Sequence, residues 1–89
     1  SVLVLPFRID SFEVLEIIRE LRDMGHNVEL DLRKKNIAKS VAWADKNGFS
    51  SVVIIGPQDL ENNQCTVKNI TSGEQKAVDL NSTSISTAL

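Results

Sequence analysis

Residues 51–75 read SVVIIGPQDLENNQCTVKNITSGEQ, and they join an apolar strand to a polar hairpin through a Gly-Pro break. The run at 51–55 is rich in valine and isoleucine, which is typical of a strand that is buried on both faces of a sheet. Proline ends this strand because it has no backbone N–H to donate to the sheet. Residues 64–70 and 74–80 are two further strand candidates on either side of a Thr-Ser-Gly turn. Their spacing predicts an antiparallel hairpin.

Upstream of this stretch, strand patterns alternate with helix patterns. Residues 2–7 are apolar throughout, whereas in residues 27–32 valine and leucine alternate with acids. The first pattern is typical of a buried strand and the second of a half-exposed one. Apolar residues at three- and four-residue spacing predict helices over 10–25 and 36–48, each with a capping residue at its start and a glycine at its end. This order predicts parallel strands joined by right-handed crossovers.

The whole pattern predicts one α/β domain over residues 1–89. Its sheet would contain three parallel strands followed by the antiparallel hairpin, with helices packed against it. The polar tail at 81–89 either starts a final helix at Ser82 or Thr83 or frays. Because the chain begins inside a strand-like run, we expect a domain cut from a longer protein.

Composition narrows the class of protein. The chain is 42% hydrophobic and 25% charged, as in a globular domain. Its formal net charge of −2 weighs against non-specific nucleic-acid binding, although a local basic patch is compatible with a negative total. Cys65 is the only cysteine, which excludes a disulfide framework and predicts a reducing, cytoplasmic setting. No apolar run approaches the roughly 20 residues that span a membrane, so we expect no membrane partner.

Known catalytic motifs are missing from the carboxyl ends of the predicted parallel strands, where enzymes of this topology bind their ligands. Residues 6–10 (PFRID) replace a dinucleotide-binding G-x-G-x-x-G, and residues 54–56 (IIG) lack the aspartate of a phospho-acceptor receiver. We interpret His26 as a solvated turn residue and Cys65 as a small core residue. The sequence therefore predicts no catalytic site, no metal site and no cofactor in this domain.

Arg33, Lys34 and Lys35 form a basic triplet between the second predicted strand and the second predicted helix. Lysines and helix N-termini both suit phosphate oxygens, so the triplet is a candidate nucleic-acid contact. The alternative is a solvated loop that only supports solubility. Trp43 also has two interpretations: stacking on a base, or, in better agreement with its place between alanines, packing against the sheet.

Three longer stretches resemble one family: residues 21–37 (LRDMGHNVELDLRKKNI), 31–60 (DLRKKNIAKSVAWADKNGFSSVVIIGPQDL) and 64–78 (QCTVKNITSGEQKAV). They are similar to the anticodon-binding domain of the class II aminoacyl-tRNA synthetases for histidine, threonine, proline and glycine. The V-K-x-x-x-S/T-G-E-Q hairpin resembles the histidyl enzymes in particular, whereas DLR before the second helix is more common in threonyl- and prolyl-type domains. The resemblance implies a mixed five-stranded sheet flanked by helices, which agrees with the predicted element order.

The resemblance implies roles for four residues near the Gly-Pro break and in the hairpin. In the family, an acidic residue after the third strand hydrogen-bonds an anticodon base. Asp59 stands at that point, with Gln58 beside it. Lys68 falls where the family places a basic residue that faces the anticodon, and Gln75 belongs to the hairpin motif. The alternative for Asp59 is that it only caps the turn after Pro57, which replaces a glutamate common in histidyl enzymes.

The resemblance also implies a function and a parent protein. Lys34 and Lys35 would neutralise the RNA backbone while the domain recognises the anticodon loop of tRNA. The parent would be a homodimeric histidine–tRNA ligase, with this chain as its C-terminal domain. Its catalytic domain, with ATP and magnesium, would lie outside this chain. The alternative is a regulatory or protein-docking module of a synthetase-like protein, which the negative net charge and Pro57 favour.

Overall fold

The computed structural model describes residues 1–33 and 36–89. Four helices and five strands follow one another in these ranges: β1 Val2–Pro6, α1 Phe12–Asp23, β2 Val28–Leu30, α2 Ile37–Lys46, β3 Ser51–Ile55, α3 Pro57–Asn62, β4 Gln64–Asn69, β5 Gln75–Asp79 and α4 Ser82–Ala88. Each predicted strand is present, and the polar tail forms α4 from Ser82 onwards. Among the residues described, none of the helices has the length and hydrophobicity of a membrane span.

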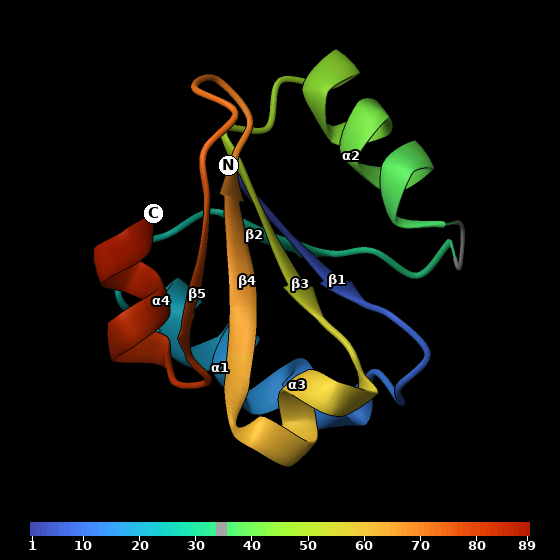
Figure 1. Cartoon of the computed structure of the whole chain (residues 1–89). Helices are drawn as coiled ribbons and strands as arrows, with labels where there is room; N and C mark the ends of the chain where they lie inside the picture. Colours follow the sequence, from blue (N-terminus) through green and yellow to red (C-terminus); the bar gives the residue numbers. More distant parts are fainter. Residues whose placement is uncertain (34–35) are drawn as a thin grey trace.

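The five strands form one mixed sheet in the order β2-β1-β3-β4-β5 (Figure 1). β1 pairs in parallel with β2 and with β3, whereas β3–β4 and β4–β5 are antiparallel. This arrangement confirms the predicted fold class, three parallel strands extended by a hairpin. The mainly apolar β3 lies in the middle of the sheet, because a strand buried on both faces needs neighbours and helices on both sides.

Helices cover the two faces of the sheet unequally. Valines and isoleucines of β1, β3 and β4 pack with α1 and α4 on one face, where Val14, Leu21 and Ile85 are fully buried. On the other face α2 packs against β1 and β3, burying Leu3, Leu5, Ala44, Phe49 and Val52. Figure 1 shows α2 standing apart from α1 and α4, beside the upper part of β3 and the hairpin turn.

Local capping explains where the two long helices begin. Asn36 caps α2 as predicted, since its side-chain oxygen accepts the Lys39 backbone N–H at 2.8 Å. α1 itself begins at Phe12, directly after Ser11, whose side chain caps no N–H. Asp10 supplies the predicted cap, since its carboxylate accepts the Phe12 N–H at 2.9 Å.

α3 is an element that the sequence pattern did not predict. Pro57 occupies its first position, where a missing N–H is no loss. The Asp59 carboxylate accepts the Gly56 N–H at 2.7 Å and so fixes the chain at the end of β3. Asn63 ends the helix in the left-handed conformation with a φ of 53°. The Gly-Pro break is therefore a strand-to-helix junction.

The fold tests the interpretations drawn from sequence for two single residues, Cys65 and His26. Cys65 is confirmed as a core residue, because only 1% of it is exposed. His26 is not simply solvated: its Nε2 lies 2.7 Å from the Ser86 hydroxyl and ties the turn after α1 to α4. The prediction failed because sixty residues of sequence separate the two partners.

Candidate nucleic-acid interface

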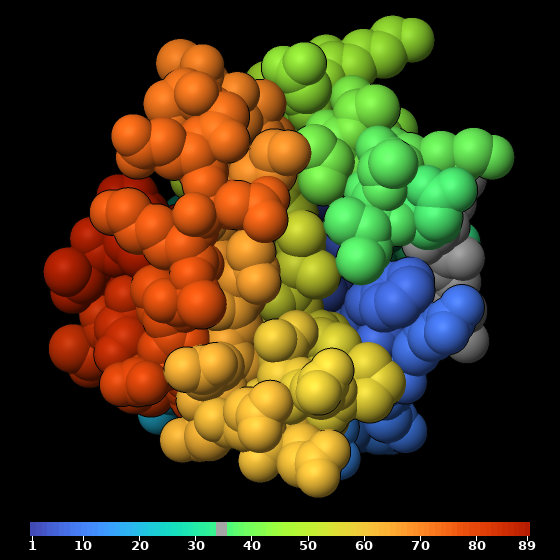
Figure 2. All heavy atoms as spheres, viewed as in Figure 1, coloured from blue at the N-terminus to red at the C-terminus, as the bar shows by residue number. Residues whose placement is uncertain are grey.

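A groove runs between α2 and the β4–β5 hairpin on the face of the sheet that α2 only partly covers. It encloses about 550 Å³, and its lining residues come from α2, β3, β4 and β5: Ile37, Ala38, Val41, Ala42, Ile54, Lys68 and Gln75. Figure 2 shows this hollow between the green atoms of α2 and the orange atoms of the hairpin. We call it the α2–β4 groove.

Strand alternation places Lys68 in this groove. Cys65 and Val67 point into the core and are almost fully buried, so Thr66 and Lys68 face the opposite side of β4. Lys68 lies directly opposite Gln75 in the β4–β5 register. Within the described ranges, Lys68 forms no salt bridge, so its ammonium group is not neutralised by a neighbouring carboxylate.

The helix side of the groove is made of small side chains. Ala38 and Ala42 are exposed and lie one turn apart on α2, next to the partly buried Ile37 and Val41. Both alanines belong to the apolar residues whose spacing predicts the helix over 36–48. The structure leaves them exposed at the edge of the apolar face of α2, where they keep the helix from filling the space above Ile54.

Gln58 and Asp59 lie beyond the end of β3, in the first turn of α3. Gln58 is exposed and Asp59 is half-buried. One carboxylate oxygen of Asp59, Oδ2, is occupied by the Gly56 N–H. The capping alternative for Asp59 is therefore confirmed as a contact, and Oδ1 is the oxygen left for a ligand, because no partner for it occurs among the described residues.

Arg33 is held away from the α2–β4 groove. Its Nε and Nη2 donate to the two carboxylate oxygens of Asp31 at 3.0 and 2.8 Å. The same guanidinium stacks on Trp43, 3.6 Å from the ring centre. These groups line a separate hollow beside the edge strand β2. The other two residues of the basic triplet, Lys34 and Lys35, lie outside the described residues.

The Arg33 contacts have an electrostatic and a packing consequence. The hydrogen bonds from Arg33 lower the pKa of the buried Asp31 carboxyl below its usual value. Trp43 is held between Arg33 and Phe49, whose ring centre is 5.5 Å from that of Trp43. The packing interpretation of Trp43 is therefore confirmed.

Cys65 shows the chemistry of an inert thiol. Burial, with the nearby charges of Asp59 and Asp79, raises its pKa to about 11. A thiol is a nucleophile only as the thiolate.

Within the described ranges, no three histidine, cysteine or acidic side chains gather to hold a metal ion. What the groove offers instead is an apolar floor with an ammonium and an amide at its rim, which suits a flat ligand with polar edges.

Comparison with known proteins agrees with this geometry. The family model described as "Anticodon binding domain" matches residues 1–84. The histidine–tRNA ligase of Methanococcus vannielii is 34% identical over 83 residues, which are 90% of this chain and 20% of the ligase. That of Natronomonas pharaonis is 41% identical over 66 residues, 74% of this chain and 15% of the ligase. The chain thus spans about a fifth or less of the length of these relatives.

Solved structures give the same result. The histidyl-tRNA synthetase from a Nostoc species superposes with a TM-score of 0.78 at 31% identity, over 88% of this chain and 19% of that one. The apo histidyl-tRNA synthetase of S. aureus superposes with a TM-score of 0.76 at 27% identity, over 90% and 24%. With the same sheet and a family model that matches nearly its whole length, the chain belongs to the anticodon-binding domain family, in the form found in histidyl-tRNA synthetases.

Proposed function

We propose that this chain is the domain of a histidyl-tRNA synthetase that binds the anticodon loop of tRNA in the α2–β4 groove. The observation that carries the proposal is the open half of the sheet face, where Lys68 and Gln75 meet above an apolar floor. Proteins read RNA sequence mainly in single-stranded loops, whose bases are free to present their flat faces and their polar edges. The groove offers a complement to both.

Each part of the groove has a distinct role in this proposal. Ile54 and the exposed alanines of α2 contact the face of a base, because apolar and small side chains allow close approach. Gln75 donates to and accepts from a base edge, since its amide carries both kinds of group. Lys68 contacts a phosphate or a base carbonyl, and its positive charge supports binding at low salt.

Gln58 and Asp59 would read a second polar edge at the end of β3. Oδ1 of Asp59 is the acceptor for this contact, while Oδ2 keeps the Gly56 N–H. A carboxylate held by a backbone hydrogen bond is already oriented before RNA arrives, which favours specific recognition. Gln58 is exposed beside it and offers a donor and an acceptor.

The basic triplet combines a structural role, at Arg33, with a proposed phosphate contact, at Lys34 and Lys35. Arg33 ties the end of β2 to α2 through its contacts with Asp31 and Trp43. We propose that Lys34 and Lys35, which follow it in sequence, neutralise phosphates next to the loop. The parent would be a cytoplasmic, homodimeric ligase that joins histidine to tRNA with ATP and magnesium. Its catalytic domain, and the contacts of that domain with this one, would lie outside the present chain.

Two substitutions on the same hairpin test the proposal. Lys68 faces the groove, whereas Lys76 lies opposite Val67 on the other face of the sheet. We expect Lys68→Ala to weaken binding of a histidine anticodon stem-loop and to reduce the salt dependence of the binding constant by about one phosphate contact. Lys76→Ala should change neither quantity by a comparable amount. Equal losses in the two variants would show that binding is non-specific.

A further inference from the structure

The half-buried Phe7 and the exposed Arg8 form an aromatic and cationic pair just beyond β1. The Phe7 N–H donates to the Ile55 carbonyl at 2.8 Å, so the chain keeps its register with β3 past Pro6. Leu3 and Leu5 are buried under α2, and alternation therefore places Phe7 on the same face of the sheet. Unlike those leucines, Phe7 is only half-buried.

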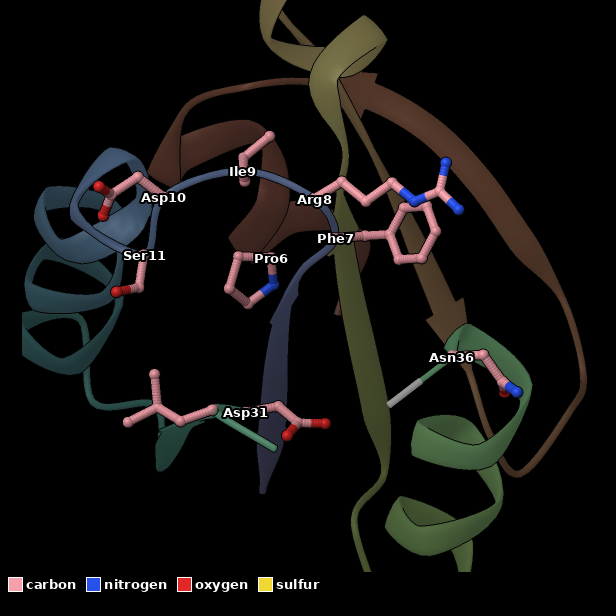
Figure 3. Close-up of a pocket in the computed structure, with 9 residues that line it drawn as sticks. Pro6, Phe7, Arg8, Ile9, Asp10, Ser11, Asp31 and Asn36 are labelled. Atoms are coloured by element: carbon pink, nitrogen blue, oxygen red, sulfur yellow. The ribbon is translucent and has the colours of Figure 1, made fainter. Parts of the chain in front are cut away.

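The Phe7 ring borders a cleft of about 600 Å³, whose other walls include Arg8, Asp31 and Asn36. Figure 3 shows the ring projecting towards the Asn36 side of this cleft, with the Arg8 side chain running alongside it. An aromatic ring that borders a cleft presents an apolar surface to water. Such a surface gains stability when a flat apolar ligand covers it.

Arg8 keeps a positive charge next to the ring. Its guanidinium carbon lies 5.1 Å from the centre of the Phe7 ring, and the residue is exposed. Within the described ranges, Arg8 takes part in no salt bridge. Its backbone is left-handed, with a φ of 57°, which is unfavourable for an arginine. An arginine at this position is thus costly for folding.

The Phe7 cleft continues the α2–β4 groove along the same sheet face. Ile54 forms part of the groove lining, and Gly56 lies two residues further along the chain, about 7 Å away at the rise of a strand. A Cβ atom at Gly56 would lie 3.9 Å from Cδ2 of Phe7, so the ring stands beside this glycine. On the helix side, Asn36 lines the cleft and its neighbour Ile37 lines the groove.

We propose that Phe7 and Arg8 form a second base site for the same RNA strand. The Phe7 ring stacks on an unpaired base next to the one in the α2–β4 groove, and Arg8 holds the phosphate between them. This inference rests on the proposed function, because it needs a single-stranded RNA ligand in the groove. Stacking on an aromatic ring tolerates any base, whereas the guanidinium forms paired hydrogen bonds to phosphate oxygens. The pair therefore sets affinity and register more than sequence preference.

The test combines a protein substitution with an RNA substitution. Phe7→Leu keeps an apolar side chain but removes the aromatic face, so the fold is retained. We expect it to weaken binding of the 89-residue chain to a histidine anticodon stem-loop at least about fivefold. A series of stem-loops, each with one abasic nucleotide at a different loop position, identifies the base that stacks on Phe7. At one position the abasic loop should bind wild type and Phe7→Leu equally.

Phe12→Leu is the control for Phe7→Leu, and Arg8→Gly tests the phosphate contact. Phe12 is 77% exposed at the start of α1, which covers the other face of the sheet, so Phe12→Leu should leave binding unchanged. Arg8→Gly suits the left-handed backbone and should not lower the unfolding midpoint. It should nevertheless weaken binding and reduce the salt dependence by about one phosphate contact.

The outcomes separate this inference from the proposed function. If wild type binds and Lys68→Ala weakens it, but Phe7→Leu binds like wild type, only the second base site is refuted. The second base site is also refuted if Phe7→Leu loses equal affinity on every abasic loop, since the ring then contacts no particular base. If wild type binds no anticodon loop at all, both proposals fail together.

Discussion

The face of the sheet on which Lys68 lies is set by the alternation of side chains along β4. A shift of one residue in the pairing of β4 with β3 would bury this lysine and expose Cys65 and Val67. The cost of burying a charge therefore holds the register in place. The same constraint that stabilises the sheet delivers a cation to the α2–β4 groove.

Asp31 should make the stability of the domain depend on acid pH. Its pKa is lowered by Arg33, and a lowered folded-state pKa adds stability that is present above the unfolded-state pKa, near 4. This stability is lost as the pH falls from about 5 through the folded-state pKa. We expect Asp31→Asn to be less stable than wild type at pH 7 by about 1–3 kcal/mol, and to lose less stability than wild type between pH 5 and pH 2.

Denaturant unfolding at a series of pH values measures this difference. Asp45→Asn is a suitable control, because Asp45 is exposed on α2 and forms no salt bridge with any described residue. Coinciding stability curves for wild type and Asp31→Asn would mean that the Asp31–Arg33 pair contributes nothing to folding.

Asp59 has a structural contact and a proposed recognition contact, and two substitutions separate them. Asp59→Asn keeps an oxygen for the Gly56 N–H but removes the charge, whereas Asp59→Ala removes both. We expect Asp59→Ala to lower the free energy of unfolding by about 1 kcal/mol, the usual cost of a lost helix cap.

If Asp59 contacts a base, both variants should also lose about 1–3 kcal/mol of discrimination between cognate and base-substituted loops, the range known for bidentate base contacts in DNA. Equal losses on both loops would leave Asp59 with its cap alone.

α2 works as a wall whose position and side-chain size create the groove. Ala44 and Phe49 fix the helix and the turn after it against the sheet, while Ala38 and Ala42 face the open side. Larger residues at the two exposed alanines would fill the space that the hairpin and helix leave between them. The groove is therefore a property of two elements together.

A single enlargement of α2 tests this idea. Ala42→Leu adds three carbons at an exposed position, so we expect a change in unfolding free energy within about 0.5 kcal/mol. Binding of the anticodon stem-loop should fall at least about tenfold, because the leucine occupies the place of a base. Ala42→Ser, which adds one atom, should bind like wild type. Tight binding by Ala42→Leu would place the RNA elsewhere on the domain.

Sequence patterns predicted the elements with strong periodicity. Along β4, the apolar Cys65 and Val67 alternate with the polar Thr66 and Lys68, which is typical of a strand with one buried face. Asn36 marked the start of α2. α3 was missed because six residues are too few to show a helical period, and Pro57 suggested only a break. Short helices depend on caps and tertiary contacts more than on pattern.

The site could be predicted only in part. The family resemblance selected Lys68 and Gln75, and the structure places both at the rim of one groove. The basic triplet, and not the resemblance, selected Arg33, whose partners Asp31 and Trp43 come together only when β2 and α2 pack side by side. The sequence did not mark Phe7 as a binding residue, because an aromatic residue at the end of an apolar run is expected in the core.

For the whole molecule, the distribution of charge matters more than the net charge of −2. α1 covers the face opposite the groove and carries four acids, Glu13, Glu16, Glu20 and Asp23, against two arginines, so four negative and two positive charges leave it with a net charge of −2. Lys68 and Arg8 lie on the groove face or at its end. This asymmetry would repel RNA from the α1 face and favour approach to the groove, with an effect that added salt weakens.

The most direct measurement is a low-salt titration of the chain with three anticodon stem-loops, for histidine, threonine and an unrelated amino acid. We predict that the histidine loop binds at least about tenfold more tightly than the unrelated loop, a difference of about 1.4 kcal/mol. Lys68→Ala should remove much of this preference, and Lys76→Ala should not. Tighter binding of the threonine loop would keep the RNA function and change the amino acid. Equal binding of all three loops, or no binding to any of them, would contradict recognition of the histidine anticodon by this domain.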